Sequence, residues 1–200
     1  MASLVSMGWN VITSTSEVTV TPPDNAVSCD VVVLGGGAAG KGYSSTTLGY
    51  GNAGSWNSGT LPPVAFTAKA GVGGAGLASS YRSGTASTVG SITGSGGSGG
   101  STSASVSNAG SYAAFGATFT GGGEASLAGS GKVPGGGGSG SSLDYITPGD
   151  GARGQVWYRW WVNPKIQNLY VGGKEVQAVY VGSKEVTAVY SGNKIIYGVA

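Results

Sequence analysis

The first part of the chain carries hydrophobic patterns that predict β-strands. Val18 and Val20 alternate with polar neighbours, the period-two pattern of a strand with one buried face. Residues 27–34 end in an uninterrupted apolar run, Val31 to Leu34, which is typical of a strand covered on both faces. We therefore expect strands at 9–15, 17–21 and 27–34, and we expect the last of them to be central to a sheet or sandwich.

The middle of the chain, from Gly35 to Gly154, is dominated by Gly, Ser, Ala and Thr. Because Gly in a helix interior costs about 1 kcal/mol relative to Ala, and no apolar stripe of helical length is free of Gly or Pro, we reject α-helix here. Short apolar islands have the length of strands, and the glycines between them permit turns and close backbone approach. These islands are Trp56, 64–68, 89–93 and 112–119.

A further strand is predicted where the glycine-rich zone ends, at residues 154–162. Its large side chains alternate between two faces, with Val156, Tyr158 and Trp160 on one and Trp157, Arg159 and Trp161 on the other. The strand can therefore be contacted on both sides. For its aromatic residues, core or interface packing is favoured over stacking on sugars, because such rings bury a large area.

From Tyr170 onward the sequence repeats with a period of ten residues. The repeats fit strands joined by two-residue turns at Gly172-Gly173, Gly182-Ser183 and Gly192-Asn193, which predicts a small β-meander. Such a meander has too little core to stand alone, so its apolar face must contact the main domain, another subunit or a neighbouring protein. The residues expected on that face are Val176, Ala178, Tyr180, Val186, Ala188 and Tyr190.

These patterns divide the chain into an N-terminal segment at 1–8, a glycine-rich β-sandwich domain at 9–162 and a repeat appendage at 163–200. Pro164 marks the joint before the appendage. The fold class expected is all-β, with a jelly-roll-like sandwich followed by the meander.

The composition excludes several common chemistries. Of 200 residues, 41 are Gly, none is His and Cys29 is the only cysteine, so imidazole catalysis, an intramolecular disulfide and a Cys/His metal cage are ruled out. Charged residues make up 9% and the net charge is +2, which gives no nucleic-acid footprint. No apolar run reaches the length of a membrane span, and the start does not resemble a signal peptide, so we expect synthesis in a cytoplasm and no membrane insertion.

One glycine-rich stretch partly matches two phosphate-binding motifs. Residues 35–40 follow an apolar strand with the G-x-G-x-x-G spacing of dinucleotide-binding enzymes, but the sequence after them cannot form the helix that this site requires. The same glycines nearly match a P-loop, whose hydroxyl position is occupied by Gly42. We therefore expect no cofactor.

Other candidate chemistry is equally weak. Asp144 and Asp150 could form a carboxylate pair or a calcium loop, but Asp beside Pro-Gly is far more often a turn former. Ser nucleophiles lack a His base, and Cys29 is expected to be a small buried hydrophobe. We expect no enzyme activity, no catalytic residue and no metal site.

Four segments, taken in order, resemble the glycine-rich domain of minor tail proteins from bacteriophages of actinobacteria. They are 18–23, 29–37, 134–138 and 151–158. The resemblance covers about residues 9–162, and the decapeptide units look like repeats of other phage tail and baseplate proteins. It implies a β-sandwich whose first and last strands pair, glycine-rich loops at its ends, and a structural or host-contacting place at the tail tip in several copies. Because long polyglycine runs are few, the sequence argues against a packed array of polyglycine helices.

These observations favour a non-enzymatic virion protein of a tail tip or fibre, made in the host cytoplasm, trimeric, and bound to other phage tail proteins. A surface of small residues loses little side-chain entropy on contact and carries little charge, so its binding should depend weakly on salt. If the protein attaches to a cell-envelope glycan or protein, the expected anchors are Tyr43, Tyr50, Tyr81 and Tyr112. Alternatives are a head decoration or head-fibre protein, a glycan-degrading or nucleotide-dependent enzyme, and an elastomeric cell-wall protein.

Overall fold

The computed structural model describes residues 4–41, 49–76, 81–101, 104–123, 126, 128–141 and 147–163, together with short strands between Tyr170 and Gly198. In this described part the regular structure is antiparallel β-sheet with one 3-10 turn, Ala104–Ser107, and no α-helix. The prediction of an all-β protein is confirmed.

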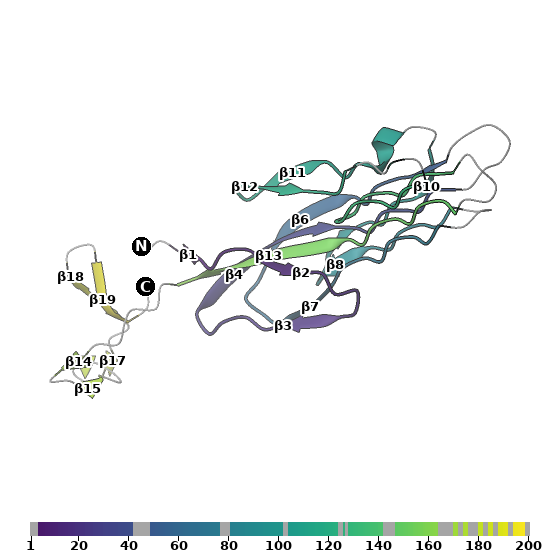
Figure 1. Ribbon diagram of the computed structural model, residues 1–200. Helices are drawn as coiled ribbons and strands as arrows, with labels where there is room; N and C mark the ends of the chain where they lie inside the picture. The colour runs from purple at the N-terminus through teal and green to yellow at the C-terminus, as the bar shows by residue number, and fades with distance from the viewer. Residues whose placement is uncertain are drawn as a thin grey trace.

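The larger sheet has the order β1-β13-β4-β6, with β2 also paired to β13 (Figure 1). Its strands are β1 (Val5–Ser6), β2 (Asn10–Ile12), β4 (Ala26–Leu34), β6 (Trp56–Leu61) and β13 (Gln155–Val162). The first and last strands of the domain therefore pair, as the resemblance implies. β4 lies between β13 and β6, and its Val31 to Leu34 side chains are fully buried, which confirms the prediction of a central strand covered on both faces.

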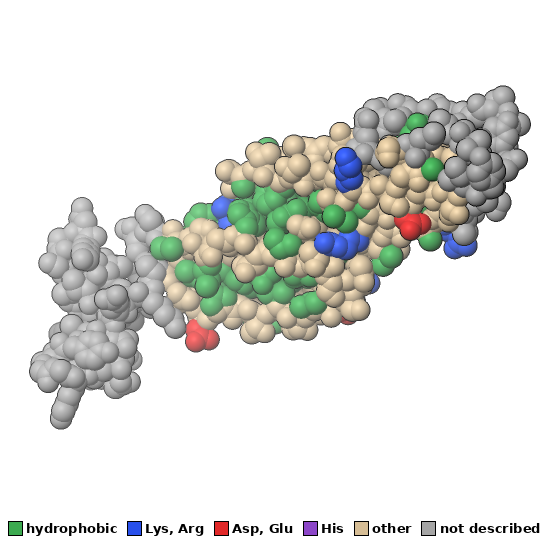
Figure 2. Space-filling model, viewed as in Figure 1, with side chains coloured by type: hydrophobic (Ala, Val, Ile, Leu, Met, Phe, Trp, Pro, Cys, Tyr) green, Lys and Arg blue, Asp and Glu red, His purple; other side chains and the backbone are tan. Residues whose placement is uncertain are grey.

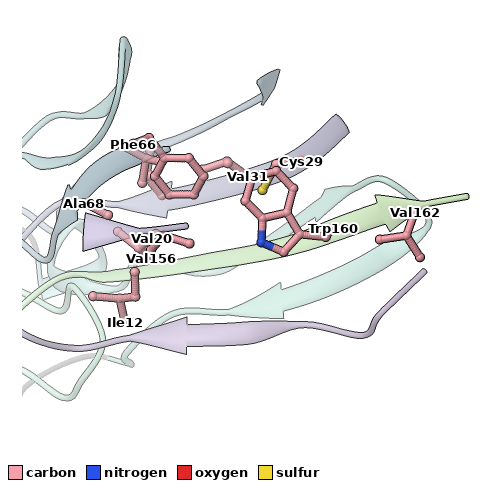
Figure 3. Close-up of a cluster of buried hydrophobic side chains, with 11 residues drawn as sticks. Ile12, Val20, Cys29, Val31, Phe66, Ala68, Val156, Trp160 and Val162 are labelled. Atoms are coloured by element: carbon pink, nitrogen blue, oxygen red, sulfur yellow. The ribbon is translucent and has the colours of Figure 1, made fainter. Parts of the chain in front are cut away.

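The smaller sheet has the order β3-β7-β8-β9 and packs against one face of the larger sheet. Its strands are β3 (Val18–Val20), β7 (Phe66–Lys69), β8 (Ser87–Val89) and β9 (Ile92–Gly94). Figure 3 shows Phe66, Cys29 and Trp160 close together in the space between the sheets. The cluster is completed by Ile12, Val20, Val31, Val33, Ala68, Val89, Val156 and Val162. The sandwich thus has a core of large side chains.

A hairpin covers part of the opposite face of the larger sheet. It consists of β11 (Ser111–Ala114) and β12 (Ala117–Thr120). The Tyr112 ring stacks on Trp56 at 5.4 Å between centroids, and Phe119 meets Trp157 edge-on at 5.4 Å. β13 is consequently contacted on both faces, as its alternating pattern predicts.

Each C-terminal repeat forms a hairpin of its own. The strands are β14 (Tyr170–Val171), β15 (Lys174–Glu175), β16 (Tyr180–Val181), β17 (Lys184–Glu185), β18 (Ala188–Ser191) and β19 (Lys194–Gly198). Val171 pairs with Lys174, Val181 with Lys184 and Ser191 with Lys194. The residues of the predicted two-residue turns, 172–173, 182–183 and 192–193, lie outside the described residues. Among the described strands, no pairing joins one repeat to the next.

The expected contact residues of the repeats are only partly placed. Tyr180, Ala188 and Tyr190 belong to strands whose side chains are not described. The others, Val176, Ala178 and Val186, lie outside the described residues.

Candidate functional site: the glycine array and its outer end

The strands of both sheets continue at one end of the molecule into extended, glycine-rich segments that lie side by side (Figure 1). Residues 35–41 follow β4, 49–55 precede β6, and 147–154 precede β13. We call this bundle the glycine array, and its other main segments are 70–76, 81–87, 94–101 and 134–141. Two short pairings within it are assigned as β5 (Tyr50–Gly51) and β10 (Gly99–Ser101).

Segment 35–41 lies at the centre of the array, and its successive amides donate to different neighbours. Gly36 N donates to Thr85 O at 3.0 Å, Gly37 N to Ala152 O at 2.8 Å, and Ala38 N to Asn52 O at 2.9 Å. The next three amides donate to the same three segments in the same order. Ala39 N donates to Arg82 O, Gly40 N to Gly149 O and Lys41 N to Gly49 O. The partners therefore recur every three residues.

The carbonyls of the same segment accept from three further segments. Gly36 O accepts from Gly97 N, Gly37 O from Gly74 N and Ala38 O from Gly138 N. A period of three residues, with backbone hydrogen bonds between segments, is that of the polyproline II helix. Segment 35–41 is thus an extended helix bonded to six surrounding segments, and the array is a packed bundle of polyglycine II type.

This finding corrects two expectations from the sequence. A packed array of polyglycine helices is present, and much of the glycine-rich zone belongs to it instead of forming loops at the ends of the sandwich. The inference from the scarcity of long glycine runs was wrong because the packing needs Gly only at the crowded positions. Ala38 and Ala39, for example, are fully buried within the central helix.

The closeness of the segments explains the high glycine content. A Cβ built on Gly37 would lie 2.0 Å from the carbonyl oxygen of Gly136, and one on Gly40 would lie 2.2 Å from that of Ser139. In both cases the obstacle is backbone, which cannot rotate away as a side chain can.

Residues 35–40, which have the G-x-G-x-x-G spacing of dinucleotide-binding enzymes, lie in this central helix. The amides of residues 36–40, which a phosphate would need, donate to carbonyls of neighbouring segments. The chain continues into Lys41, which pairs with Gly49. The motif therefore serves the packing of the array.

The outer end of the array, away from the sheets, is where the chain leaves Lys41 and re-enters at Gly49. Lys41 Nζ lies 5.6 Å from the centre of the Tyr81 ring, a cation–π distance. The ring of Tyr81 lies against Gly49 and Gly99, on which a Cβ would come within 2.3 Å and 2.1 Å of Tyr81 atoms. Tyr50 follows Gly49 and pairs with Ser101.

Of the four tyrosines predicted as surface anchors, the structure brings Tyr50 and Tyr81 to this outer end, both half-buried. Tyr43 lies outside the described residues. Tyr112 is elsewhere, packed on Trp56 with its hydroxyl 2.9 Å from Ser58 Oγ. Lys41 was not among the predicted anchors, although a lone cation close to Tyr43 in the sequence was a usable signal.

Asp150, considered above as part of a carboxylate pair, caps a backbone amide at the same end. Its Oδ1 accepts from Gly76 N at 2.6 Å, so the side chain links two segments of the array that are far apart in the sequence. Asp144 lies outside the described residues.

A model of a family described as glycine-rich domain matches residues 13–118. The chain belongs to this glycine-rich domain family. The match ends within β12, whereas the fold of this family member is completed later in the chain, by array segments 134–141 and 147–154 and by β13. A comparison with curated proteins gives no match.

A buried polar network, not anticipated from the sequence, links the hairpin of this glycine-rich domain protein to its larger sheet. Arg159 Nε donates to Asp30 Oδ2 at 3.0 Å, and Arg159 Nη2 donates to the carbonyl of Phe115, in the hairpin turn, at 2.8 Å. Asp30 also accepts from Trp161 Nε1 at 2.7 Å and Thr60 Oγ1 at 3.1 Å. The signal in the sequence was that the predicted strands 27–34 and 154–162 each contain one charged residue, Asp30 and Arg159, among mainly apolar neighbours. These two residues are paired in the sheet.

The same guanidinium lies between two indole rings. It is 4.6 Å from the centre of the Trp9 ring and 4.7 Å from that of Trp161. Phe115 and Gly116 have φ angles of 52° and 72°, the left-handed values of a type I′ turn. Because a bulky residue rarely adopts a positive φ, we infer that the bond from Arg159 helps to hold this turn.

Cys29 lies in the sandwich core with Tyr158 packed against it, and both groups resist deprotonation. Burial, and secondly the charge of Asp30, raises the pKa of the Cys29 thiol from 9.0 to about 12. Burial also raises the pKa of Tyr158. At neutral pH the thiol is therefore protonated and a poor nucleophile, in agreement with its interpretation as a small hydrophobe.

Within the described ranges, no three His, Cys, Asp or Glu residues are grouped so as to hold a metal ion. No helix in that part of the chain is long and apolar enough to cross a membrane.

Proposed function

We propose that this protein is a structural component of the tail tip or tail fibre of a long-tailed bacteriophage of actinobacteria. It would contact the host surface through the outer end of the glycine array. The proposal is supported by its glycine-rich domain and by its resemblance to minor tail proteins. Other tail proteins and further copies of the chain, as a trimer, are its proposed partners, and the virion is its proposed location.

The observation that carries this proposal is the hydrogen-bonded central helix of the array. Each of its amides from Gly36 to Lys41 is bonded to another segment, so the end at Lys41 is fixed relative to the sandwich. A rigid support reduces the entropy lost when a surface binds. The chain leaves and re-enters the array at this end between Lys41 and Gly49, between Gly76 and Tyr81, and between Ser141 and Thr147.

The chemistry of the outer end suits a neutral or weakly charged ligand. Tyr50 and Tyr81 supply aromatic surface with few rotatable bonds, and Lys41 supplies a cation that the Tyr81 ring orients. A cell-envelope glycan or an envelope protein would fit these groups. Because charges are few, we expect this binding to weaken little as salt is raised.

Binding of the purified protein to host cells tests the attachment role. We expect the double variant Lys41→Ala with Tyr50→Ala to lose at least about tenfold in affinity, since each contact contributes on the order of 1 kcal/mol. Replacing residues 42–48, which include Tyr43, by a Gly-Ser linker of equal length should abolish binding. Val64→Ala is the matched control, because Val64 lies in the turn between β6 and β7, at the other end of the sandwich. Unchanged binding by the outer-end variants would contradict the attachment role.

Labelling of intact particles tests the place of the protein in the virion. A labelled antibody should bind at the tail tip. Binding at the capsid would instead favour a head decoration or head-fibre protein and would overturn the proposed location.

We also propose that the protein is not an enzyme. Incubation with envelope polysaccharide should release no fragments, and nucleotides should not raise its melting temperature. Cleavage or a nucleotide-dependent shift would contradict this.

A further inference from the structure

The Tyr81 side chain lies directly on backbone at the outer end of the array. A Cβ built on Gly49 would lie 2.3 Å from the Tyr81 hydroxyl oxygen, and one built on Gly99 would lie 2.1 Å from Tyr81 Cβ. The two glycines belong to neighbouring segments, which are joined where Gly99 pairs with Gly51. Tyr81 therefore spans two segments, and backbone that cannot rotate away fixes its position.

This seat leaves part of the ring uncovered. The ring atoms nearest to the two glycines lie on one side of the ring, Cε1 at Gly49 and Cδ1 at Gly99, and Tyr81 as a whole is half-buried. A tyrosine has two side-chain torsions, so it loses little entropy when a ligand covers it. The ring is thus a preorganised aromatic surface of the kind that a stacking ligand requires.

Lys41 places a cation beside this ring. Its Nζ lies 5.6 Å from the ring centre, close to the limit of about 6 Å for a cation–π contact. Among the described residues, no carboxylate forms an ion pair with Lys41, and Asp150 at the same end accepts from Gly76 N. Because an ammonium group has three donors and no acceptor, Lys41 can donate to oxygen atoms of a ligand that rests on the ring.

The described part of the array offers little of the apolar area that a protein partner would need. In the view of Figure 2, hydrophobic side chains gather over the sandwich, around β2 and β13, whereas the array shows mainly backbone and small polar groups. The large hydrophobic side chain that is exposed in the described array segments is Val72, whose carbonyl lies beside Gly36, near the sandwich. Stable protein interfaces bury about 1,200–2,000 Å² around an apolar core. The described outer end therefore suits a small polar ligand better than a protein.

We propose that Tyr81 is a platform for a sugar ring of an envelope polysaccharide, and that Lys41 donates to the hydroxyl groups of this sugar. A pyranose ring presents carbon-bound hydrogens on a face and hydroxyl groups around its rim. The hydrogens match the aromatic surface, and the hydroxyl oxygens match the ammonium donors. The inference rests on the proposed attachment to a host surface and deepens it, because it selects a glycan over a protein and names the residue that holds it.

Selective treatment of host cells tests the class of ligand. Periodate cleaves sugars between neighbouring hydroxyl groups, and a protease removes exposed envelope proteins. We expect the full-length wild type to bind protease-treated cells as well as untreated cells, and to lose at least about tenfold in affinity for periodate-treated cells. Binding that survives periodate would overturn the sugar platform and leave the attachment role intact. Absence of binding to untreated cells would overturn both.

Variants of Tyr81 test the platform itself. Tyr81→Leu keeps an apolar side chain but removes the aromatic surface, so we expect it to bind untreated cells at least about tenfold more weakly. Tyr81→Phe restores the ring and should recover most of the lost affinity. Tyr112→Leu is the matched control, because the Tyr112 ring packs on Trp56 away from the outer end. Melting temperatures show whether each variant is folded, and wild-type affinity in a folded Tyr81→Leu variant would overturn the platform.

A spectroscopic measurement on the wild type does not depend on the folding of any variant. Polysaccharide purified from the host cells is added to the isotope-labelled protein, and the amide resonances of Gly49 and Gly99 are followed. We expect both to shift in a saturable way, because these residues carry the Tyr81 ring, whereas the amide of Gly123, near Lys132, should not shift. Unchanged Gly49 and Gly99 resonances at a polysaccharide concentration that blocks cell binding would overturn the proposal.

Discussion

In the sandwich, β4 and β13 bury large side chains between two sheets, whereas the array segments that continue these strands bury mainly backbone. The change occurs within one step of the chain. Leu34 is a fully buried side chain, and at the next residue, Gly35, a Cβ would lie 1.9 Å from the carbonyl oxygen of Ser95. The sandwich is held by apolar contacts and the array by hydrogen bonds between backbones. Removing atoms should therefore damage the first region, and adding atoms should damage the second.

The largest effect is expected from adding a methyl group inside the array. Gly37→Ala places a Cβ 2.0 Å from Gly136 O, with backbone as the obstacle, so we expect a loss of more than about 4 kcal/mol in the free energy of unfolding, measured by chemical denaturation. Gly123→Ala is the control, because its nearest neighbour would be Lys132 Cδ at 3.9 Å. Equal stability of the two variants would contradict the close packing.

The next effect is expected from removing a large side chain in the sandwich. Trp160 is 4% exposed and contacts Phe66, with 5.7 Å between ring centroids. Trp160→Ala should lower the free energy of unfolding by about 3–5 kcal/mol, since it loses buried area and leaves a cavity. Chemical denaturation gives the value. A loss below about 1 kcal/mol would mean that this core does not depend on its large side chains.

A smaller effect is expected from separating the hairpin from the sheet. Arg159→Met leaves the buried Asp30 carboxylate without its cation, and we expect a loss of about 3 kcal/mol. Amide exchange at 111–120 should accelerate, because the bond to Phe115 O is lost. The double variant Arg159→Met with Asp30→Asn should recover part of the stability. Unchanged exchange in the hairpin would exclude the clamping role of Arg159.

The smallest effect concerns alkaline pH and the sandwich core. The pKa of Cys29 is about 12 in the folded protein, against 9.0 ordinarily, so between these values the unfolded chain loses a proton that the folded protein retains. Stability is fully present below pH 9 and should fall as pH rises through this window, so that at pH 10, where the comparison is made, about 1.4 kcal/mol is lost. Cys29→Val should show a shallower decline in denaturation experiments. Identical slopes would contradict the burial of the thiol in the folded state.

The same comparison explains which features could be predicted from the sequence. β4 and β13 were predictable because side-chain alternation and apolar runs report directly on burial. The array was not, because its regularity lies in backbone hydrogen bonds with a three-residue period, and small residues such as Ala38 and Ser139 occupy it alongside glycine. Tyr50 and Tyr81 were selected by their contrast with a glycine-rich background, and the structure places both at the outer end of the array. Tyr112 was predicted as a surface anchor, but its ring packs on Trp56. This contact depends on how the β11–β12 hairpin folds onto the larger sheet, which residue spacing alone does not predict.

Native-state hydrogen exchange of the full-length protein, resolved by residue, tests most directly whether the glycine array is a hydrogen-bonded structure. The account predicts that the amides of Gly36, Gly37, Ala38, Ala39 and Gly40 are protected to a degree comparable with those of β4. Exchange of these five amides at the rate of an unfolded chain, while β4 remains protected, would contradict it.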